Sequence, residues 1–383
     1  HKMRDLHSKK KTINTTTTTT TNLPKNINNQ SINNQLLQLA ITESLKPQYK
    51  PKVNKNPVIT HKKGNQLIFI SAQPDNIYFH WQVELYLHNF TKFIPKERCY
   101  AIFGYENKPS EYIKNLKKKY PNIYWYKDNR TERHYVPSIR PNILKQFFKQ
   151  FPYLGKYVFY HDSDILFQKL PDFKNLLSDD ISYLSDTISY IGYNYITGCC
   201  RRYKDKYPEL KSNDLLVKMA DCCNISVDLI KSNENNSGGA QYLLKNIDYD
   251  FWNQSEIDQN KLYKIMCDYE NTYPIDHHIQ KWTSDMWAVL WNIWKRGQHT
   301  KVSPDLSFSW ATGTVSEYYK HNIFHLAGVN PDMKKTKFYK GEYANSNPIE
   351  KLRSNPSFFD YIAKDNATTK YIENMKDYIN KND

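Results

Sequence analysis

The chain has 383 residues, of which 39% are hydrophobic and 15% aromatic, so it can bury a sizeable core and is not disordered throughout. Its formal net charge of +15 first suggests a nucleic-acid-binding protein, but residues 1–63 hold twelve Lys/Arg and two Asp/Glu, which leaves only +5 for the rest. Because zinc-finger, helix-turn-helix and RNA-recognition signatures are also missing, the sequence argues against a specific nucleic-acid partner.

The first 60 residues are low in complexity, with threonine and asparagine runs that cannot build a core. We predict that residues 1–60 form a disordered basic tail, in which Ser31–Leu45 could form a short helix. The rest is predicted to be a single domain over residues 61–345, followed by a helical extension over residues 346–383.

Alternating strands and helices are predicted after residue 64. Apolar runs bounded by polar residues predict strands, and apolar residues three or four apart predict helices. The predicted strands are Asn65–Gln73, Arg98–Tyr105, Asn122–Asp128 and Lys156–Phe167, and the predicted helices are Tyr78–Phe90 and Pro137–Phe151. Residues 178–235 are polar and are predicted to be loops, whereas 255–300 is predicted to be helical. This alternation predicts an α/β fold, with a mostly parallel sheet flanked by helices on both faces.

Two aspartates end the fourth apolar run, in the stretch KYVFYHDSDILF. Such sheets bind ligands at the carboxyl ends of their strands, which is where Asp162 and Asp164 are placed. Two carboxylates at this spacing are hard oxygen ligands that suit Mg²⁺ or Mn²⁺ shared with a diphosphate. A second pair, Asp248 and Asp250, has the same spacing but does not end a comparable apolar strand, and we interpret it as a solvated strand end.

The pattern around Asp162 and Asp164 resembles that of GT-A glycosyltransferases, whose nucleotide-sugar-binding α/β fold carries a DxD motif at the end of a strand. Arg140, in VPSIRPNIL, is similar to the arginine on the helix before the DxD in family-8-like enzymes, where it meets the donor nucleotide. Segments similar to later family-8-like motifs follow in the expected order at Asn236–Trp252, Trp282–Ala288 and Phe324–Val329.

A more local resemblance concerns PDNIYFHWQVELYLHNF, residues 74–90. It is similar to the PYFxWQ start of plant peptidyl-serine galactosyltransferases and hydroxyproline arabinosyltransferases, whose WxxEM motif corresponds to WTSDM here. The chain departs from the family pattern where His161 precedes the DxD, where Ser237-Gly238-Gly239 replaces Asn-Ala-Gly, and where Asp285-Met286 replaces Asp-Gln. These departures bear on the sugar and on the stereochemistry that the resemblance implies.

The resemblance implies a site for a metal and a donor. Asp164 is predicted to be a direct metal ligand, with Asp162 on the metal or the ribose. His325 would be the third ligand, although a lone histidine after an apolar run is more often a satisfied buried residue. Arg140 would bind phosphate oxygens, which suit a guanidinium, or form a surface salt bridge. Gln73, just past the first strand, would bond the base or the ribose.

Asp285 is predicted to lie at the reaction centre. It would bond sugar hydroxyls, act as a base on the acceptor or stabilise an oxocarbenium-like centre, and its alternative role is a helix N-cap. Gln241 is the second catalytic candidate and Asp276 the third. Gly238 and Gly239 would let the backbone approach the sugar, or form a plain turn. The tryptophans of this region are interpreted as core residues: Trp282, Trp287, Trp291 and Trp294.

Together these assignments predict a catalytic domain, a metal-dependent glycosyltransferase with Mn²⁺ or Mg²⁺ as cofactor. It would move a hexose or pentose from a nucleoside diphosphate sugar, in the first place a UDP-sugar, to a protein or glycan hydroxyl. The family-8-like motif order favours a retaining reaction. Three alternatives stay open: an inverting enzyme with Asp285 as base, a nucleotidyl or phosphoryl enzyme, against which the missing P-loop counts, and a non-catalytic carbohydrate- or nucleotide-binding protein.

The cysteines and the apolar segments bear on the compartment. Cys199-Cys200 and Cys222-Cys223 could pair in a disulfide or be free thiols. No segment is apolar over a membrane-spanning length, so we expect a soluble cytoplasmic protein if Met3 starts the chain, and a Golgi enzyme if an upstream anchor was removed. Few glycines with many Asn, Lys, Ile and Tyr are typical of an AT-rich coding genome, such as that of a giant virus.

Overall fold

The computed structural model describes residues 66–382. Its main sheet has seven strands in the order β3-β2-β1-β4-β7-β6-β8, and it is parallel except at β7, which runs antiparallel to both of its neighbours. The strands are β1 (Ile68–Pro74), β2 (Cys99–Tyr105), β3 (Ile123–Lys127), β4 (Tyr157–Tyr160), β6 (Ser182–Asp186), β7 (Gly238–Lys245) and β8 (Thr300–Val302). The predicted α/β fold with a mostly parallel sheet is confirmed. The predicted tail, including the short helix at residues 31–45, lies outside the described residues.

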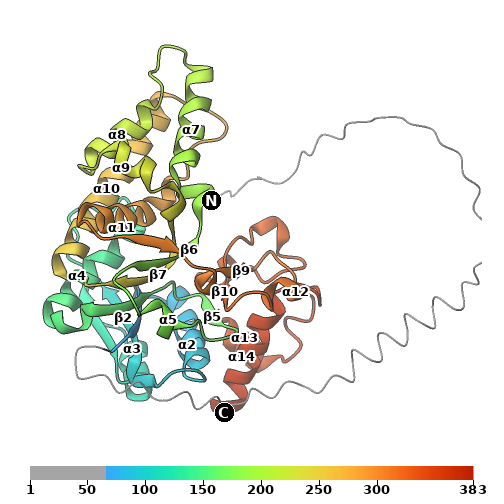
Figure 1. The fold of residues 1–383 in the computed structure, drawn as a ribbon. Coiled ribbons are helices and arrows are strands. Elements are labelled where there is room, and N and C mark those ends of the chain that lie inside the picture. The colour runs from blue at the N-terminus through green and yellow to red at the C-terminus, as the bar shows by residue number, and fades with distance from the viewer. Residues whose placement is uncertain (1–65, 383) are drawn as a thin grey trace, which may run out of the picture. The chain divides into compact units, whose positions relative to one another are not determined.

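Helices cover both faces of this sheet because strand side chains alternate between the faces. Ile68 and Ile70 of β1 belong to one hydrophobic core cluster, and Phe69 between them belongs to another. Figure 1 shows the first face beneath α4, α10 and α11, and the opposite face against α2 and α3. The bounds of these helices are Ile77–Phe90 for α2, Glu111–Lys119 for α3, Ile139–Gln150 for α4, Tyr249–Thr272 for α10 and Ser284–Lys295 for α11.

The predicted fourth strand, Lys156–Phe167, is wrong as one element. It is divided into β4, which ends at Tyr160, and β5 (Ile165–Phe167), which belongs to a separate three-stranded sheet of order β5-β10-β9. The other strands of that sheet are β9 (Phe308–Trp310) and β10 (Ile323–His325). Residues 161–164, which are all polar, separate the two halves, and β5 pairs with β10 instead of continuing in the main sheet.

The prediction of loops over residues 178–235 is also wrong. This stretch contains β6 and the helices α6 (Ile188–Ile191), α7 (Tyr193–Lys206), α8 (Asp214–Cys222) and α9 (Val227–Ser232), which follow the short helix α5 (Phe173–Leu176). The helices α7, α8 and α9 lie together beyond α10 and α11 in Figure 1. Their polar composition hides short amphipathic repeats, such as buried Leu215, Leu216 and Met219 on α8.

The end of the chain packs on the start of the domain. Trp81 and Leu85 of α2 share a third hydrophobic cluster with Phe324 of β10 and with Tyr371 and Met375 of α14. The helices of this region are α12 (Val315–Tyr318), α13 (Pro348–Ser354) and α14 (Thr368–Asn382). The predicted boundary between residues 345 and 346 remains a prediction.

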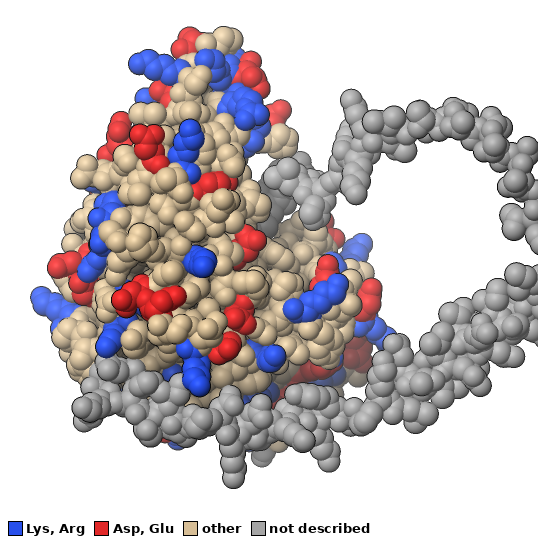
Figure 2. Space-filling model, in the orientation of Figure 1, with Lys and Arg blue, Asp and Glu red and all other residues tan. Residues whose placement is uncertain are grey.

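Three further features concern the cysteines, the apolar character of the helices and the surface charge. All six cysteines are free thiols, so the disulfide alternative is wrong. Within residues 66–382, no helix has both the length and the apolar character needed to cross a membrane. Figure 2 shows positive and negative side chains interspersed on the visible face of the described residues, a mixture typical of a surface that faces water.

Candidate metal and reaction centre

The segment between β4 and β5 is held in a fixed conformation. The backbone N–H of His161 donates to the Ile70 carbonyl at 3.1 Å, which extends the pairing of β4 with β1 by one residue. The buried His161 ring donates from Nδ1 to the Asp162 carbonyl at 2.8 Å. Ser163 donates to Gln82 Oε1 on α2 at 3.1 Å. These bonds fix the peptides on either side of the two aspartates.

Asp162, Asp164 and His325 converge at this point. One possible ligand atom from each lies within 4.8 Å of the others. His325 ends β10, and its register partner on β5 is Ile165, directly after Asp164. Its Nε2 is 3.4 Å from Asp162 Oδ2 and 3.3 Å from Asp164 Oδ1. Two carboxylates and an imidazole form a donor set that Mn²⁺ accepts, and Mg²⁺ would use the same carboxylates.

Two cations flank the carboxylates of this cluster. Arg140, in the first turn of α4, places Nη1 2.8 Å from Asp162 Oδ1. Lys340, in the 3-10 helix η8 (Lys340–Tyr343), donates from Nζ to Asp164 Oδ2. Burial opposes ionisation of Asp164, but Lys340 and His325 outweigh it and hold the pKa of this carboxyl well below its usual range. Burial also opposes the charge on His325, yet Asp164 and Asp162 raise the pKa of the imidazole to about 9.

Asp285 faces the same arginine from the first turn of α11. Its Oδ2 lies 3.5 Å from Arg140 Nη1, so one guanidinium nitrogen lies near both Asp162 and Asp285. Its Oδ1 accepts from the Met286 backbone N–H at 3.0 Å. Burial raises the pKa of Asp285 although Arg140 opposes the shift. The N-cap residue of α11 is Thr283, so the alternative role of Asp285 as N-cap is wrong.

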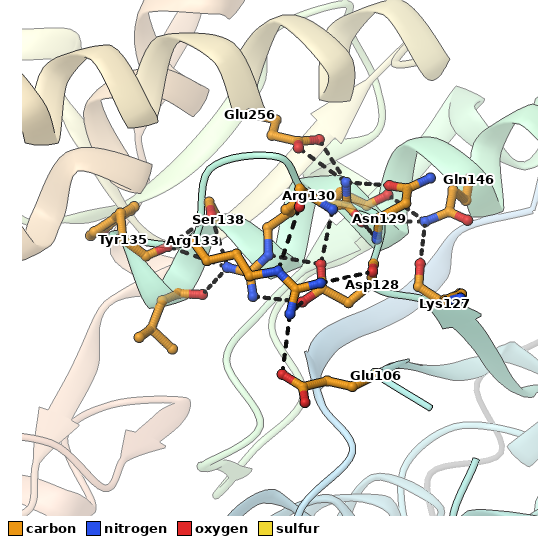
Figure 3. Close-up of polar contacts among 12 residues, drawn as sticks. Glu106, Lys127, Asp128, Asn129, Arg130, Arg133, Tyr135, Ser138, Gln146 and Glu256 are labelled. Carbon is orange, nitrogen blue, oxygen red and sulfur yellow. Dashed lines mark hydrogen bonds and ion pairs between the residues drawn. The ribbon is translucent and has the colours of Figure 1, made fainter. Parts of the chain in front are cut away.

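Tyr135 holds Asp285 from the other side. Its Oη lies 2.9 Å from Asp285 Oδ1 and 2.6 Å from the Trp282 carbonyl, and it accepts from the Asp285 backbone N–H at 3.1 Å. Figure 3 shows how the segment that carries Tyr135 is anchored. Arg130 forms a buried ion pair with Asp128 at 2.8 Å and donates to Ser138 Oγ at 2.9 Å, which ties the segment to the start of α4.

Gln241 contacts two of the three candidate metal ligands. Its Oε1 accepts from the Asp162 backbone N–H at 3.2 Å, and its Nε2 is 3.5 Å from His325 Nδ1. Gln73 donates from Nε2 to the Ile102 carbonyl at 3.0 Å, whereas its buried Oε1 has no hydrogen-bond partner among the described residues. The third catalytic candidate, Asp276, is exposed in the segment after α10.

Packing leaves little room for a side chain at either of the two glycines before Gln241. A Cβ on Gly238 would lie 2.3 Å from the Ser185 carbonyl oxygen. A Cβ on Gly239 would lie 2.5 Å from Tyr242 Oη and 2.7 Å from Met286 Cε. Gly239 therefore lets β7 approach the start of α11, next to Asp285.

The second aspartate pair has another use. Asp248 is the N-cap of α10, where its side chain accepts from the Phe251 N–H, and it forms an ion pair with Arg296 at 2.7 Å. Three of the four tryptophans interpreted as core, Trp287, Trp291 and Trp294, are buried, but Trp282 is half exposed.

Sequence reasoning missed Lys340 and Tyr135. No signal in the sequence marks either residue, because Lys340 follows no motif and Tyr135 is one of 31 tyrosines. Both reach the cluster only through tertiary contacts. Lys340 approaches from a segment 176 residues after Asp164, and Tyr135 from one 150 residues before Asp285.

The fold and the site together define an α/β domain with a candidate metal centre at the carboxyl edge of its sheet, and solved structures similar to it are glycosyltransferases. The bifunctional glycosyltransferase WbbM in its apo form is 12% identical, with a TM-score of 0.38, over 80% of this chain and 52% of that chain. The galactosyltransferase LgtC, in complex with donor and acceptor sugar analogs, is 12% identical, with a TM-score of 0.34, over 76% of this chain and 99% of that chain. GlyE of Streptococcus pneumoniae TIGR4 is 8% identical, with a TM-score of 0.35, over 82% of this chain and 64% of that chain.

The chain thus spans about half the length of WbbM and just under two thirds of GlyE. No protein-family model and no curated protein sequence matches it. The similarity to family-8-like enzymes and to the plant transferases remains a prediction.

Proposed function

We propose that the protein is a metal-dependent glycosyltransferase of the GT-A type that takes its sugar from a nucleoside diphosphate sugar. The observation that supports this most directly is the convergence of Asp162, Asp164 and His325, with Arg140 and Lys340 beside them, at the carboxyl edge of the sheet. Three ligands and two cations in one place suit a metal-bound diphosphate better than a metal alone.

In this proposal Asp162, Asp164 and His325 hold Mn²⁺, or Mg²⁺ in its place. A bound divalent ion neutralises the diphosphate and stabilises the charge that builds up as this group leaves. Lys340 and Arg140 would contribute two more positive charges beside the diphosphate oxygens. Arg140 also keeps Asp162 and Asp285 in place through its ion pairs with both.

The nucleotide would lie at the end of β1, where Gln73 has an unsatisfied acceptor. A buried carbonyl oxygen without a partner costs about 1–3 kcal/mol, so the unpaired Oε1 favours a ligand that brings a donor. A uracil N–H or a ribose hydroxyl supplies one, and we therefore propose a UDP-sugar as donor. Gln241 would orient His325 and the Asp162 peptide.

Asp285 would act at the sugar or at the acceptor hydroxyl of a protein or glycan. Arg140 and Tyr135 hold its two oxygens from different sides, which suits a carboxylate that must be oriented. The motif order favours retention. An inverting reaction with Asp285 as general base is the second candidate, and the raised pKa of this carboxyl favours it because a more basic carboxylate accepts a proton more readily. The anomeric configuration of the product distinguishes the two.

The test is a screen of nucleotide sugars for release of the nucleoside diphosphate, with Mn²⁺ and with EDTA. We expect release from one donor class with Mn²⁺ and none with EDTA. Asp164→Asn should lower the rate at least ~100-fold, the effect of removing one transition-state contact. Asp250→Asn, in the second aspartate pair, is the matched control and should keep the wild-type rate. Full turnover in EDTA would refute the metal assignment, and no turnover of any donor would favour a non-catalytic binding protein.

A further inference from the structure

Trp310 lies next to the candidate metal centre and remains exposed. It ends β9, and its register partner on the parallel strand β10 is His325. The two rings are nearly parallel, with an interplanar angle of 19° and centroids 6.2 Å apart. The residue is nevertheless 38% exposed. A large aromatic side chain beside a buried candidate ligand thus faces the solvent.

A second ring connects Trp310 to the reaction centre. Tyr190, on α6, lies edge-on to Trp310 with centroids 6.4 Å apart. The carbonyl of the next residue, Ile191, accepts from the indole N–H of Trp287 at 2.8 Å, and Trp287 follows Asp285 by two residues on α11. The two rings therefore form an aromatic corner between the small sheet and α6, close to the start of α11.

The indole is held in place but its polar group is free. Gly328, at φ +92°, lies against the edge of the indole, since a Cβ there would be 3.4 Å from Trp310 Cε3. Phe308 packs edge-on at 4.9 Å from the other side. Two buried tryptophans use their indole N–H groups within the protein, Trp287 on the Ile191 carbonyl and Trp294 on Thr300. The indole N–H of Trp310 bonds to no residue among those from 66 to 382.

We propose that Trp310 and Tyr190 form the acceptor subsite, and that its ligand is a pyranose ring of a glycan, an assignment that rests on the function proposed above. The apolar C–H face of a pyranose packs on an exposed indole, and a hydroxyl of the sugar accepts a hydrogen bond from the free indole N–H of Trp310. In the proposed function, the donor sugar must lie against the metal-bound diphosphate. A platform that stays open to solvent suits the ring that arrives last and leaves with the product.

The first experiment measures binding and needs no turnover. Saturation-transfer NMR would be recorded with the methyl pyranosides of glucose, galactose, mannose and xylose and with a serine-containing peptide, in UDP and Mn²⁺. We expect at least one pyranoside to bind, and Trp310→Ala to weaken it about tenfold or more. Trp310→Phe, which keeps an aromatic ring, should lose less pyranoside affinity than Trp310→Ala. Tyr153→Ala, a 58% exposed aromatic on the segment that precedes β4, is the matched control and should bind as the wild type does.

The second experiment separates acceptor from donor. In Trp310→Ala, KM for the pyranoside acceptor should rise about tenfold or more, and it should rise more than KM for metal-dependent hydrolysis of the donor without acceptor. An equal or larger rise in KM for the donor would place the donor sugar on Trp310 and overturn the assignment. Binding of the peptide alone, or equal behaviour of Trp310→Ala and Tyr153→Ala, would also overturn it.

The two proposals fail in different ways. If the protein binds pyranosides through Trp310 but hydrolyses no nucleotide sugar, the sugar platform stands and the transferase proposal fails. If it hydrolyses a donor but its pyranoside affinity is insensitive to Trp310, the transferase stands and the subsite fails.

Discussion

Replacing Arg140 by methionine should destabilise the protein far more than a single surface ion pair would. Arg140 and Asp162 are 23% and 20% exposed, and Asp285 competes for the same Nη1. The substitution leaves two mostly buried carboxylates without their cation, beside a third on Asp164. Removing one partner of a buried pair costs about 3–5 kcal/mol, and the residual exposure puts the expected loss near the lower limit, about 3 kcal/mol.

Urea unfolding followed by circular dichroism measures this loss in EDTA and in Mn²⁺. The control is Arg296→Met. Arg296 is 32% exposed and its ion-pair partner Asp248 is 46% exposed, so the expected loss of unfolding free energy is at most about 1 kcal/mol. Mn²⁺ should reduce the difference in unfolding free energy between the wild type and Arg140→Met. The reason is that the variant's cluster has more uncompensated negative charge and therefore binds the cation more tightly. Two results would refute the role of Arg140 as counter-ion of the cluster. One is an equal loss of unfolding free energy in Arg140→Met and Arg296→Met, and the other is a difference between the wild type and Arg140→Met that Mn²⁺ leaves unchanged.

Three further substitutions test single contacts. Lys340→Met should raise the affinity for Mn²⁺ alone and lower the affinity for UDP about tenfold in calorimetric titrations, because the lysine competes with the metal but assists the diphosphate. Gly239→Ala should lower the unfolding free energy by about 1–3 kcal/mol, because the added Cβ would displace a side chain beside Asp285. The control Gly198→Ala has open space on helix α7 and should raise the unfolding free energy by up to ~1 kcal/mol. Tyr135→Phe should keep UDP affinity in the same titration while kcat falls, and an unchanged kcat would exclude a role in orienting Asp285.

The parallel half of the sheet could be predicted because its strands have continuous apolar runs that end in polar residues. The position of Asp162 and Asp164 followed from one rule about where such sheets bind ligands. The division of residues 156–167 into two strands could not be predicted, because β5 pairs with β10, more than 150 residues away. Local periodicity contains no information on such a partner.

The cations around the two aspartates also depend on contacts between distant parts of the chain, which local sequence patterns do not predict. The sequence motif indicates the candidate ligands, but it gives no indication of which cations balance their charge. Arg140 was accessible through its place before the DxD, and Lys340 was not, because a lysine in an irregular segment has no distinguishing pattern. Gln241 and Gly239 remain predicted site residues, and the structure places Gln241 against Asp162 and His325 and Gly239 in a packing contact with Met286.

The balance of charge in the cluster leads to a prediction about cooperativity. Asp162, Asp164 and Asp285 face Arg140, Lys340 and an imidazole whose pKa is raised to about 9, so positive and negative charges are nearly equal. Mn²⁺ alone would add positive charge next to Lys340 and Arg140, and UDP alone would add negative charge next to the carboxylates. Each disturbs the balance and together they restore it, so their binding should be positively coupled.

Coupling between two ligands is typically about 1–3 kcal/mol, or about 5- to 150-fold in affinity, and it must be the same for either order of binding. Calorimetric titration of Mn²⁺ with and without UDP, and of UDP with and without Mn²⁺, measures both sides after correction for the Mn²⁺–UDP complex in solution. Asp164→Asn removes a ligand and the partner of Lys340, so the coupling should fall in that variant and persist in Asp250→Asn. If UDP binds the wild type equally well with and without Mn²⁺, the cluster does not join the metal to the diphosphate, and the ion would have to bind elsewhere.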